Sequence, residues 1–526
     1  MNAKCCLRLL HPRQGLPALR PAPHQCDASR RSTLPTLASP ITLRPFTCSS
    51  KARLASAPSQ ARSGSKTVEP CPIKLFAPVY ADLPVFPIRS ANVDVIQTPS
   101  DFYNELKNGI RRAKKRIYLA SLYIGSEETE LISVLRESLA SNPDLQAHVL
   151  IDCLRGTRGG NSASSASLLQ PLVDEFPGRI LVSLYHTPNL KGLTKQIVPR
   201  RFNEAFGLMH LKIYGFDDDV IISGANLNRD YFVNRQDRYV LFRNTPELSN
   251  YFQDLMSTIA EFSHRLTTPL PQEREFHNQG KLLDEFRARW IERTKETRAL
   301  VMNSSDVDNQ HDTVLAPVIQ MGLFGVRQDQ QAITTILKLA SQSCSRDAKW
   351  AVHLSSAYLN FPKVYAQLIT KSTALFKIIT SAPEANGFYG SKGVSRHLPA
   401  AYTYMEKLFL RQLKGAGRSE SVELYEYKKD RWTFHAKGLW CTPPQQKHPV
   451  LTVVGSSNFG QRSMDRDLEA QVVLITKNAE VSKKLGQNLE FIMHTTSIVD
   501  EATLDRPDRQ VHYLVKLAAR LIRTML

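Results

Sequence analysis

Apolar and polar positions follow two different periods along the chain beyond its first seventy residues. Residues 102–113 have apolar side chains at helical spacing and predict a helix that Ser100 can cap. Its apolar stripe consists of Phe102, Leu106, Ile110 and Ala113. Short apolar runs at 147–153 and 179–186 predict strands, and helical patterns lie between the runs. Strands that alternate with helices predict an α/β fold, a mixed sheet flanked by helices.

The same order of elements returns in the second half of the chain. The second set comprises a helix at 333–343, strands at 350–361 and 375–383, and a helix at 399–413. The likeness reaches single residues, because LASLY at 119–123 corresponds to LSSAY at 354–358. We therefore expect two pseudo-symmetric halves, with an active site at the seam between them.

Each half also carries a histidine and a lysine two positions apart, ahead of a turn that ends in asparagine. His210 and Lys212 share one face of a predicted strand, because alternate side chains of a strand point the same way. His435 and Lys437 repeat the pair. The turns are Gly224-Ala225-Asn226 and Gly455-Ser456-Ser457-Asn458. One such stretch is typical of a solvated edge strand, but a solvated strand does not recur with its turn attached.

Two imidazoles and two ammonium groups around one point suit a reaction at tetrahedral phosphorus. One histidine would attack as nucleophile, and the other would protonate the leaving oxygen and then deprotonate the acceptor. Lys212, Lys437, Asn226 and Asn458 would hold the non-bridging oxygens. This chemistry needs no metal and no cofactor, and we expect neither.

A nucleophilic histidine also needs a carboxylate on its second ring nitrogen. Asp237 lies 27 residues after His210, and Glu469 lies 34 residues after His435. The hairpin of the second half is longer by six residues, so the two spacings nearly coincide. We expect Asp237 and Glu469 to orient the histidines; the alternative is that both are rim carboxylates in salt bridges.

The net charge of +19 is concentrated at the start of the chain. Residues 1–66 hold eleven Lys or Arg and one acid, which leaves +9 for residues 67–526. This leader is rich in Arg, Ser and Pro, and it predicts a disordered mitochondrial transit peptide; a basic tail that binds anionic surfaces is the alternative. The remainder has no apolar run long enough to span a bilayer, and we expect no transmembrane helix.

The cysteines show neither a disulfide framework nor a zinc spacing. Four of them fall in the leader, and Cys71, Cys153, Cys344 and Cys441 stand singly. This usage is typical of a reducing compartment.

These motifs resemble the signature of the phospholipase D superfamily, H-x-K-x4-D followed by a glycine-asparagine turn. His210, Lys212 and Asp217 complete the first copy, whereas Thr442 stands at the aspartate position of the second. Within the superfamily, GANLNRDYFVNRQDRY, IVPRRFNEAFG, QMGLFGVRQD and FHAKGLW look like the mitochondrial CDP-diacylglycerol–glycerol-3-phosphate 3-phosphatidyltransferases. The resemblance covers roughly residues 75–526. Thr442 puts an aspartate-dependent role of the second half in doubt.

The resemblance implies two phospholipase D-like halves and a specific reaction. The phosphatidyl group of CDP-diacylglycerol would pass to a histidine with release of CMP, and then to glycerol 3-phosphate. The product, phosphatidylglycerophosphate, leads to phosphatidylglycerol and cardiolipin. Family analogy makes His210 the nucleophile and His435 the general acid and base, with Lys212, Asp217 and Lys437 in the catalytic group.

Two anionic substrates also need cationic and polar side chains near the motifs. The candidates for substrate binding are Asn226, Asn458, Ser457, Arg238 and Arg462. Arg200, Arg201, Arg235 and Arg466 lie close to the motifs as well, and a solvated surface position is the alternative for each arginine.

The pattern divides the chain into five parts. They are the leader 1–66, the N-terminal half 75–263, a linker with a charged helix at 264–312, the C-terminal half 313–510, and an amphipathic helix at 511–526. The last helix has an apolar face made of Val511, Leu514, Val515, Ala518, Leu521, Ile522 and Met525. Its cationic face consists of His512, Lys516, Arg520 and Arg523. Such a helix suits an anionic membrane surface, with packing on the protein core as the alternative.

Two other functions compete with the transferase interpretation. A phosphodiesterase or nuclease of the same superfamily would use water as acceptor, but residues 67–526 show no concentrated basic groove, so we expect no nucleic-acid partner. A degenerate lipid-binding scaffold is disfavoured because both His-Lys pairs are intact. We expect an enzyme on the matrix side of the mitochondrial inner membrane.

Overall fold

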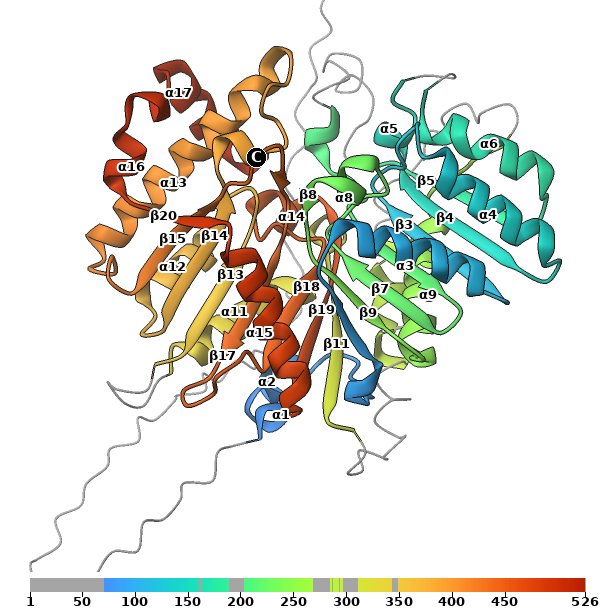
Figure 1. Cartoon of the computed structure of the whole chain (residues 1–526), viewed down its shortest axis with the longest axis horizontal. Coiled ribbons are helices and arrows are strands. Elements are labelled where there is room, and N and C mark those ends of the chain that lie inside the picture. Colours follow the sequence, from blue (N-terminus) through green and yellow to red (C-terminus); the bar gives the residue numbers. More distant parts are fainter. Residues whose placement is uncertain are drawn as a thin grey trace, which may run out of the picture. The chain divides into compact units, whose positions relative to one another are not determined.

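Two mixed sheets with helices packed on them carry the fold (Figure 1). The computed structural model describes residues 71–159, 163–188, 203–267, 284–285, 287–292, 294–296, 311–342 and 349–525. They belong to one compact unit, Val68–Leu526. The leader, Arg200, Arg201 and most of the predicted linker lie outside the described residues.

The first sheet belongs to the N-terminal half. In spatial order its strands are β10 (His264–Arg265), β5 (Ile180–Tyr185), β4 (Gln146–Asp152), β3 (Arg116–Ser121), β6 (Ile213–Phe216), β7 (Asp219–Ser223), β9 (Tyr239–Phe242) and β2 (Val93–Ile96). Its helices are α3 (Pro99–Arg112), α4 (Thr129–Ser141), α5 (Cys153–Gly156), α6 (Ser165–Glu175), α8 (Arg229–Val233) and α9 (Pro246–Glu261). Strands β3, β4 and β5 are parallel, and the other pairings are antiparallel.

The second sheet repeats this plan and is longer. Its strands are β1 (Phe86–Ile88), β11 (Thr313–Met321), β19 (Leu468–Thr476), β18 (Leu451–Gly455), β17 (Gly438–Thr442), β13 (Ala351–Ser355), β14 (Leu375–Ser381), β15 (Val422–Tyr427) and β20 (Thr496–Val499), with β12 (Val326–Arg327) beside β11. Its helices are α1 (Pro72–Leu75), α2 (Ala77–Tyr80), α11 (Gln328–Ala340), α12 (Lys363–Lys371), α13 (Leu398–Gly415), α14 (Gln461–Asp465), α15 (Ala479–Met493), α16 (Glu501–Asp505) and α17 (Tyr513–Leu521). The predicted α/β halves are confirmed.

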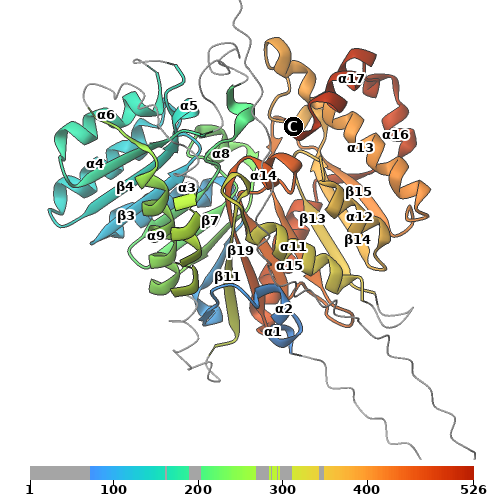
Figure 2. The same ribbon diagram turned by 180° about the vertical axis from the view of Figure 1, so that it is seen from behind.

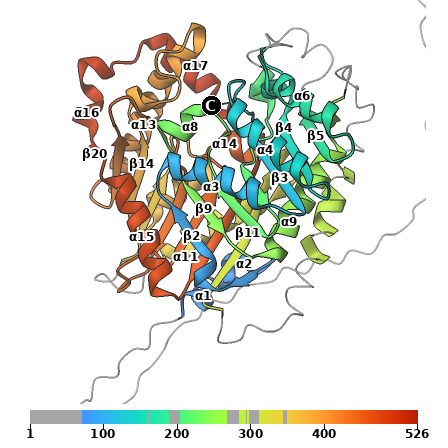
Figure 3. The same ribbon diagram turned by 45° about the vertical axis from the view of Figure 1, so that its right-hand side comes forward.

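Three apolar cores place the helices on the sheets. Helices α3, α4 and α6 share a core with one face of the first sheet, and α1, α2, α11 and α12 share a core with one face of the second. The third core contains α9, α15 and side chains from both sheets, so it fills the seam. Figure 2 shows α9 on the first sheet, and Figure 3 shows α3 over the first sheet and α15 beside β2.

Local signals explain where the first long helix begins and ends. The side chain of Thr98 accepts a hydrogen bond from the Asp101 N–H, and Pro99 stands in the first turn of α3. The helix cap is therefore Thr98 rather than Ser100. The stripe predicted from the sequence, with Phe102, Leu106 and Ile110 at its centre, is buried against the sheet.

Both ends of the N-terminal half differ from the predicted boundaries. Strand β1 pairs with β11, and the ring of Phe76 packs edge-on against Trp350, so residues 71–88 belong with the C-terminal half. Strand β10 pairs with β5 and extends the N-terminal half to Arg265. In the predicted linker, Trp290 is buried in the seam core. The boundaries differ because composition does not reveal that β1, near the start of the described residues, pairs with β11 of the C-terminal half.

Candidate active site

The two histidines stand at the seam, and each is held by the backbone of the opposite half. His210 precedes β6 and its N–H donates to the carbonyl oxygen of Leu468, 2.9 Å away. His435 follows the short strand β16 (Thr433–Phe434), which pairs with β8 (Arg235–Gln236), and its N–H donates to Gln236. Both imidazoles are buried. In both halves, therefore, a backbone hydrogen bond from the histidine N–H to the opposite half positions the ring.

The carboxylates Glu469 and Asp237 bind the histidines in a crossed arrangement. Glu469 lies at the start of β19, and its Oε2 is 2.9 Å from Nδ1 of His210. Asp237 follows β8, and its Oδ2 is 2.7 Å from Nδ1 of His435. A carboxylate on Nδ1 keeps the proton there and leaves Nε2 free for chemistry. Each half thus supplies the carboxylate for the histidine of the other half.

Further hydrogen bonds fix both carboxylates in place. Glu469 accepts from the hydroxyls of Ser456 and Ser463, and it is fully buried. Asp237 accepts from the N–H of Arg238 at 2.8 Å. Gly224 stands where an added Cβ would lie 2.5 Å from a carboxylate oxygen of Asp237, so the turn can approach only because it lacks a side chain. The rings are therefore oriented before any substrate arrives.

Burial and neighbouring charges set the protonation of these groups. Burial lowers the pKa of both imidazoles, and the charge of Lys437 lowers that of His435 further. Burial raises the pKa of Asp237 to about 6, whereas at Glu469 the interactions with His210 and with the Lys212 ammonium outweigh burial and lower the pKa. Neutral imidazoles are competent nucleophiles and bases.

Each lysine lies directly beside its own histidine. The Nζ atoms of Lys212 and Lys437 donate to the carbonyl oxygens of His210 and His435, at 2.7 Å in both cases. Burial lowers the pKa of Lys212 well below its usual range and that of Lys437 to about 8. The backbone uses one donor position of each ammonium, and the Nζ of Lys437 also lies 2.7 Å from Nδ1 and 3.2 Å from Nε2 of its histidine. The remaining donor positions can bind the oxygens of a phosphate group.

Each of the two turn asparagines has a buried side-chain oxygen. The Nδ2 of Asn226 donates to the hydroxyl of Tyr231 at 3.1 Å. Among the described residues, neither the Oδ1 of Asn226 nor that of Asn458 has a hydrogen-bond partner. A buried amide oxygen without a partner costs free energy, which a ligand or a water can recover. Ser457 differs, because its hydroxyl accepts from the Phe459 N–H and interacts with Asp329.

The structure does not bring Asp217 to the histidines. Asp217 occupies the turn between β6 and β7, at the opposite end of β6 from His210, with a backbone φ of 52°. Its carboxylate accepts the backbone N–H groups of Lys114, Lys115 and Arg116. The assignment of Asp217 to the catalytic group was therefore wrong, because its oxygens already fasten the loop before β3.

Arg238 is also directed away from the site. It is fully buried, its guanidinium donates to Thr452, Val453 and Asn488, and it covers the ring of Trp440 at 3.8 Å. Successive residues of an extended chain point to opposite sides, so Asp237 faces His435 while Arg238 faces the second sheet. The substrate-binding role predicted for Arg238 is replaced by one in packing.

Arg462 takes part in a second set of crossed contacts beside His210. Its Nε donates to Asp467 at 3.0 Å, and its Nη2 donates to the carbonyl oxygen of Glu204. Asp467 in turn accepts the N–H of Leu208, two residues before His210. Arg462 therefore stabilises the backbone of residues 204–208, which precede His210.

The structure adds aromatic groups that motif spacing did not identify. The hydroxyl of Tyr231 lies 3.4 Å from Nε2 of His435, and the ring of Tyr358 lies 6.0 Å from the imidazole. Arg235 covers the ring of Tyr231 at 4.5 Å. A signal was present, since Tyr358 is the last residue of the repeated LSSAY segment and corresponds to Tyr123 in LASLY.

Two repeated α/β halves that bring two H-x-K histidines to one seam define a site of the phospholipase D class. No family model matches the chain. Among solved structures, the phosphatidylserine synthase of Haemophilus influenzae is similar in fold, with a TM-score of 0.65 and 20% identity. The match covers 84% of this chain and 97% of that one.

Curated relatives identify the branch of this class. Enzymes named CDP-diacylglycerol–glycerol-3-phosphate 3-phosphatidyltransferase, mitochondrial, are 38% identical in Gallus gallus and 36% identical in Homo sapiens. The matches cover 84% of this chain and 85% and 84% of those proteins. A probable enzyme of the same name in Dictyostelium discoideum is 38% identical, over 80% of this chain and 76% of its own length. The chain belongs to the CDP-diacylglycerol–glycerol-3-phosphate 3-phosphatidyltransferase family.

Proposed function

We infer that this protein is a transferase that passes the phosphatidyl group of CDP-diacylglycerol to sn-glycerol 3-phosphate in mitochondria. The products are phosphatidylglycerophosphate and CMP. The names of relatives that match more than four fifths of the chain support the reaction and the organelle. The observation that carries the proposal is the crossed pairing of His210 with Glu469 and of His435 with Asp237.

The first half-reaction forms a phosphatidyl-histidine. The free Nε2 of His210 attacks the phosphorus that bears diacylglycerol, and the bond from this phosphorus to the bridging oxygen breaks. His435 donates a proton from Nε2 to that oxygen, so CMP leaves as a stable phosphate monoester. Bound diphosphate favours protonation of His435, which offsets the lowering of its pKa by burial.

The second half-reaction regenerates the enzyme. The 1-hydroxyl of glycerol 3-phosphate gives its proton to Nε2 of His435 and attacks the same phosphorus. The P–N bond to His210 breaks, and the lipid product leaves. Lys212, Lys437 and the turn residues Asn226 and Asn458 stabilise the charge on the non-bridging oxygens. In the flipped orientation of the Asn226 side-chain amide, Oδ1 accepts a hydrogen bond from the Tyr231 hydroxyl. The amide N–H groups then face the phosphate.

The proposal includes no metal and no cofactor, because two histidines supply the nucleophile and the proton transfers. Protein dialysed against a chelator should keep its transferase activity. Loss of activity that returns with one added divalent cation would require a revised mechanism.

The decisive experiment uses purified protein, CDP-diacylglycerol and glycerol 3-phosphate, and follows CMP and lipid products. Phosphatidylglycerophosphate that forms only when the acceptor is present supports the proposal. Phosphatidic acid as the product with or without the acceptor would instead show a phosphodiesterase that uses water. A His210→Ala variant is the matched control for contaminating activity.

The structure also bears on how the enzyme reaches a lipid. No helix of the described residues is long and apolar enough to cross a membrane. Helix α17 begins at Tyr513 with His512 as its cap, and the predicted apolar face divides into two rows. Val511, Val515 and Ala519 pack against α13, whereas Leu514, Leu517 and Leu521 are exposed. The single predicted stripe was therefore wrong, since Ala519 rather than Ala518 faces the core.

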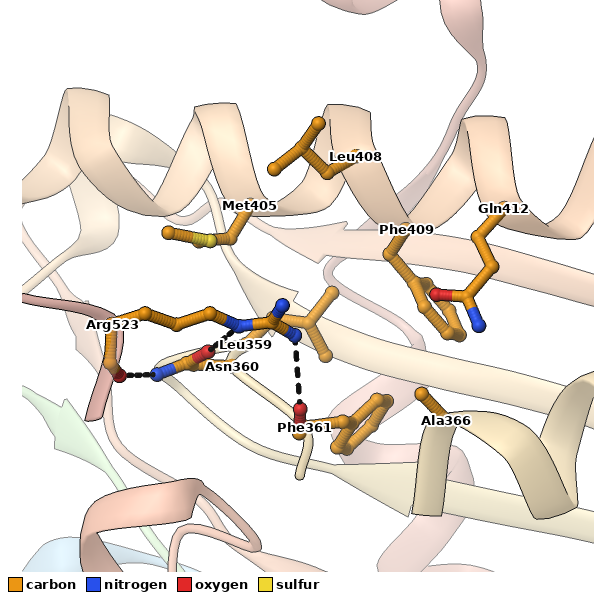
Figure 4. A pocket seen from close by; sticks show the side chains of 9 residues that line it. All are labelled: Leu359, Asn360, Phe361, Ala366, Met405, Leu408, Phe409, Gln412 and Arg523. Atoms are coloured by element: carbon orange, nitrogen blue, oxygen red, sulfur yellow. Dashed lines mark hydrogen bonds between the residues drawn. The ribbon is translucent and has the colours of Figure 1, made fainter. Parts of the chain in front are cut away.

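The end of the chain holds this helix against the C-terminal half. Arg523 donates from Nε to the side chain of Asn360 and from Nη2 to the carbonyl oxygen of Phe361, so it lines a small pocket of about 50 Å³ rather than the cationic face predicted for it (Figure 4). The exposed leucines are 54%, 54% and 76% accessible. Lys516 and Arg520 lie on the same helix as these leucines.

The proposal therefore includes a membrane-contact surface, defined as Leu514, Leu517 and Leu521 of α17 with Val394 of the segment that leads into α13. Val394 is 62% exposed and lies between Lys392 and Arg396. Exposed apolar side chains among cations suit an anionic bilayer surface. The proposed site of action is the matrix side of the mitochondrial inner membrane.

A further inference from the structure

Aromatic rings contact the imidazole of His435, whereas no ring contact with His210 is found among the described residues. The ring of Tyr231 meets the imidazole of His435 edge-on at 5.1 Å, and that of Tyr358 does so at 6.0 Å. Tyr358 is itself backed by Tyr402 at 5.2 Å and Phe388 at 5.8 Å. His210 is surrounded instead by Glu469, Asp467 and Lys212 among its charged neighbours.

The ring of Tyr358 packs against other aromatic rings, and the residue remains partly accessible to solvent. Its ring is held from behind by α13 and by the segment that contains Phe388, and the residue keeps partial exposure to solvent. A partly exposed ring with a rigid support loses little entropy when a flat ligand stacks on it. This geometry suits a stacking platform.

A guanidinium stands beside this platform. Arg235 donates from Nε to the hydroxyl of Thr433 and from Nη2 to Asp230, and it lies over the ring of Tyr231. The residue is mostly buried, and its charge is among those that lower the pKa of His435. Because the hydroxyl of Tyr231 lies 3.4 Å from Nε2 of His435, the guanidinium above the Tyr231 ring is placed on the same side of the site as that imidazole.

The surroundings of Gly387 show that the hydroxyl of Tyr358 and the guanidinium of Arg235 lie close together. A Cβ added to Gly387 would lie 3.2 Å from the hydroxyl of Tyr358 and 3.8 Å from Nη2 of Arg235. A ring platform, a guanidinium and a proton-donating imidazole in one place match the three parts of a nucleoside monophosphate leaving group: base, phosphate charge and departing oxygen.

We propose that Tyr358 and Arg235 form the subsite for the CMP portion of the substrate, with the pyrimidine stacked on Tyr358 and the phosphate held by Arg235. The inference rests on the proposed function, because it assigns CMP to the His435 side, where the leaving oxygen receives its proton. Glycerol 3-phosphate enters the same side after CMP has left. Arg235 then binds the phosphate of glycerol 3-phosphate. Tyr358 makes no stacking contact with this acceptor, because glycerol 3-phosphate has no aromatic base.

Calorimetric titration of the full, detergent-solubilised protein with CMP and with ribose 5-phosphate tests this assignment. Tyr358→Leu should weaken CMP binding by about 5- to 150-fold, the range expected for one stacked base, and leave ribose 5-phosphate binding unchanged. Tyr358→Phe keeps the ring and should retain CMP affinity. Arg235→Gln should weaken both ligands and raise KM for glycerol 3-phosphate, a kinetic change that Tyr358→Leu should not produce.

Tyr389→Leu is the matched control, because this tyrosine lies one residue beyond Phe388 and is 61% exposed. It should bind both ligands as the wild type does. Equal weakening of CMP and ribose 5-phosphate by Tyr358→Leu, or no weakening of CMP, would overturn the subsite. A wild-type protein that fails to make the lipid product would overturn the proposed function, whereas normal transfer without selective CMP loss would overturn the subsite alone.

Discussion

Glu469 of the C-terminal half and His210 of the N-terminal half are 259 residues apart and share a hydrogen bond of 2.9 Å. Asp237 and His435 form the reciprocal pair at 2.7 Å. The two halves are therefore joined through the catalytic groups themselves, and each carboxylate should affect a different proton-transfer or bonding step.

Glu469→Gln should slow formation of the phosphatidyl-enzyme, because an amide no longer fixes the reactive tautomer of His210. We expect a fall in kcat of about 10²- to 10⁴-fold with little change in melting temperature. Labelled CDP-diacylglycerol, quenched protein and peptide mass spectrometry measure the covalent species. Wild-type label should lie on His210; label on His435 would reverse the roles, and label on neither would contradict the covalent mechanism.

The pH dependence should show a loss of activity on the alkaline side. Lys437 has a pKa of about 8 in the free enzyme, lowered by burial, so its ammonium is present below that pH and is lost above it. We expect kcat/KM to fall tenfold per pH unit well above pH 8, because the non-bridging oxygens lose a cation. Bound phosphate raises the pKa, so the decline in kcat should begin at higher pH.

A profile of kcat/KM from pH 6 to 10 provides the measurement. Lys516→Gln, which removes a lysine of α17 instead, should leave the shape of the profile unchanged. A profile that stays flat to pH 10 would show that Lys437 does not need its charge.

Asp217 should matter for folding rather than chemistry. Asp217→Ala removes the acceptor for three backbone N–H groups, and alanine fits poorly at a φ of 52°, so we expect a loss of about 2 kcal/mol in the free energy of unfolding. The folded fraction should keep a kcat close to wild type. Asp218→Asn, at the next position of the turn, should cost less than about 0.5 kcal/mol. A large fall in kcat of folded Asp217→Ala would restore the catalytic assignment.

The two rows of the last helix should separate membrane contact from packing. Replacing Leu514, Leu517 and Leu521 together by Ser should weaken binding to anionic vesicles by at least about 10-fold at constant melting temperature. Ala519→Asp places a charge against α13 and should lower the melting temperature by several degrees. Vesicle sedimentation and thermal melts distinguish the two, and unchanged sedimentation of the triple variant would exclude this surface.

The leader should act in delivery alone. Deletion of residues 1–66 should leave the transferase activity of purified protein intact and abolish mitochondrial import in cells. Fluorescence microscopy and fractionation report import, and the full-length chain is the control. Mitochondrial accumulation of the shortened chain would show that the targeting signal lies outside residues 1–66.

Strand alternation and internal repetition were enough to predict much of the site. They placed each lysine beside its histidine, although both pairs lie just before strands β6 and β17 rather than within a strand. The coincidence of spacing selected Asp237 and Glu469. The crossing of the carboxylates could not be obtained this way, because spacing along the chain says nothing about which half a side chain meets in three dimensions.

The errors have similar physical causes. Arg238 was selected for its charge beside a motif, although alternation from Asp237 already directed it to the opposite side. In α17 the helical period identified apolar positions but not the row that packs, because Val515 and Leu514 are equally apolar and only α13 distinguishes them. Periodicity describes one element, whereas burial depends on its neighbour.

The pairing of β1 with β11 has a consequence for the order in which the chain acquires its structure. Residues 71–88 come first among the described residues, but their partners, β11 and Trp350, follow more than 220 residues later. A chain that emerges amino end first, from a ribosome or through a translocation channel, must hold this segment unpaired while the intervening half emerges. Completion of the fold then waits for the C-terminal sheet, and the apolar side chains of this segment stay exposed to solvent in the interval.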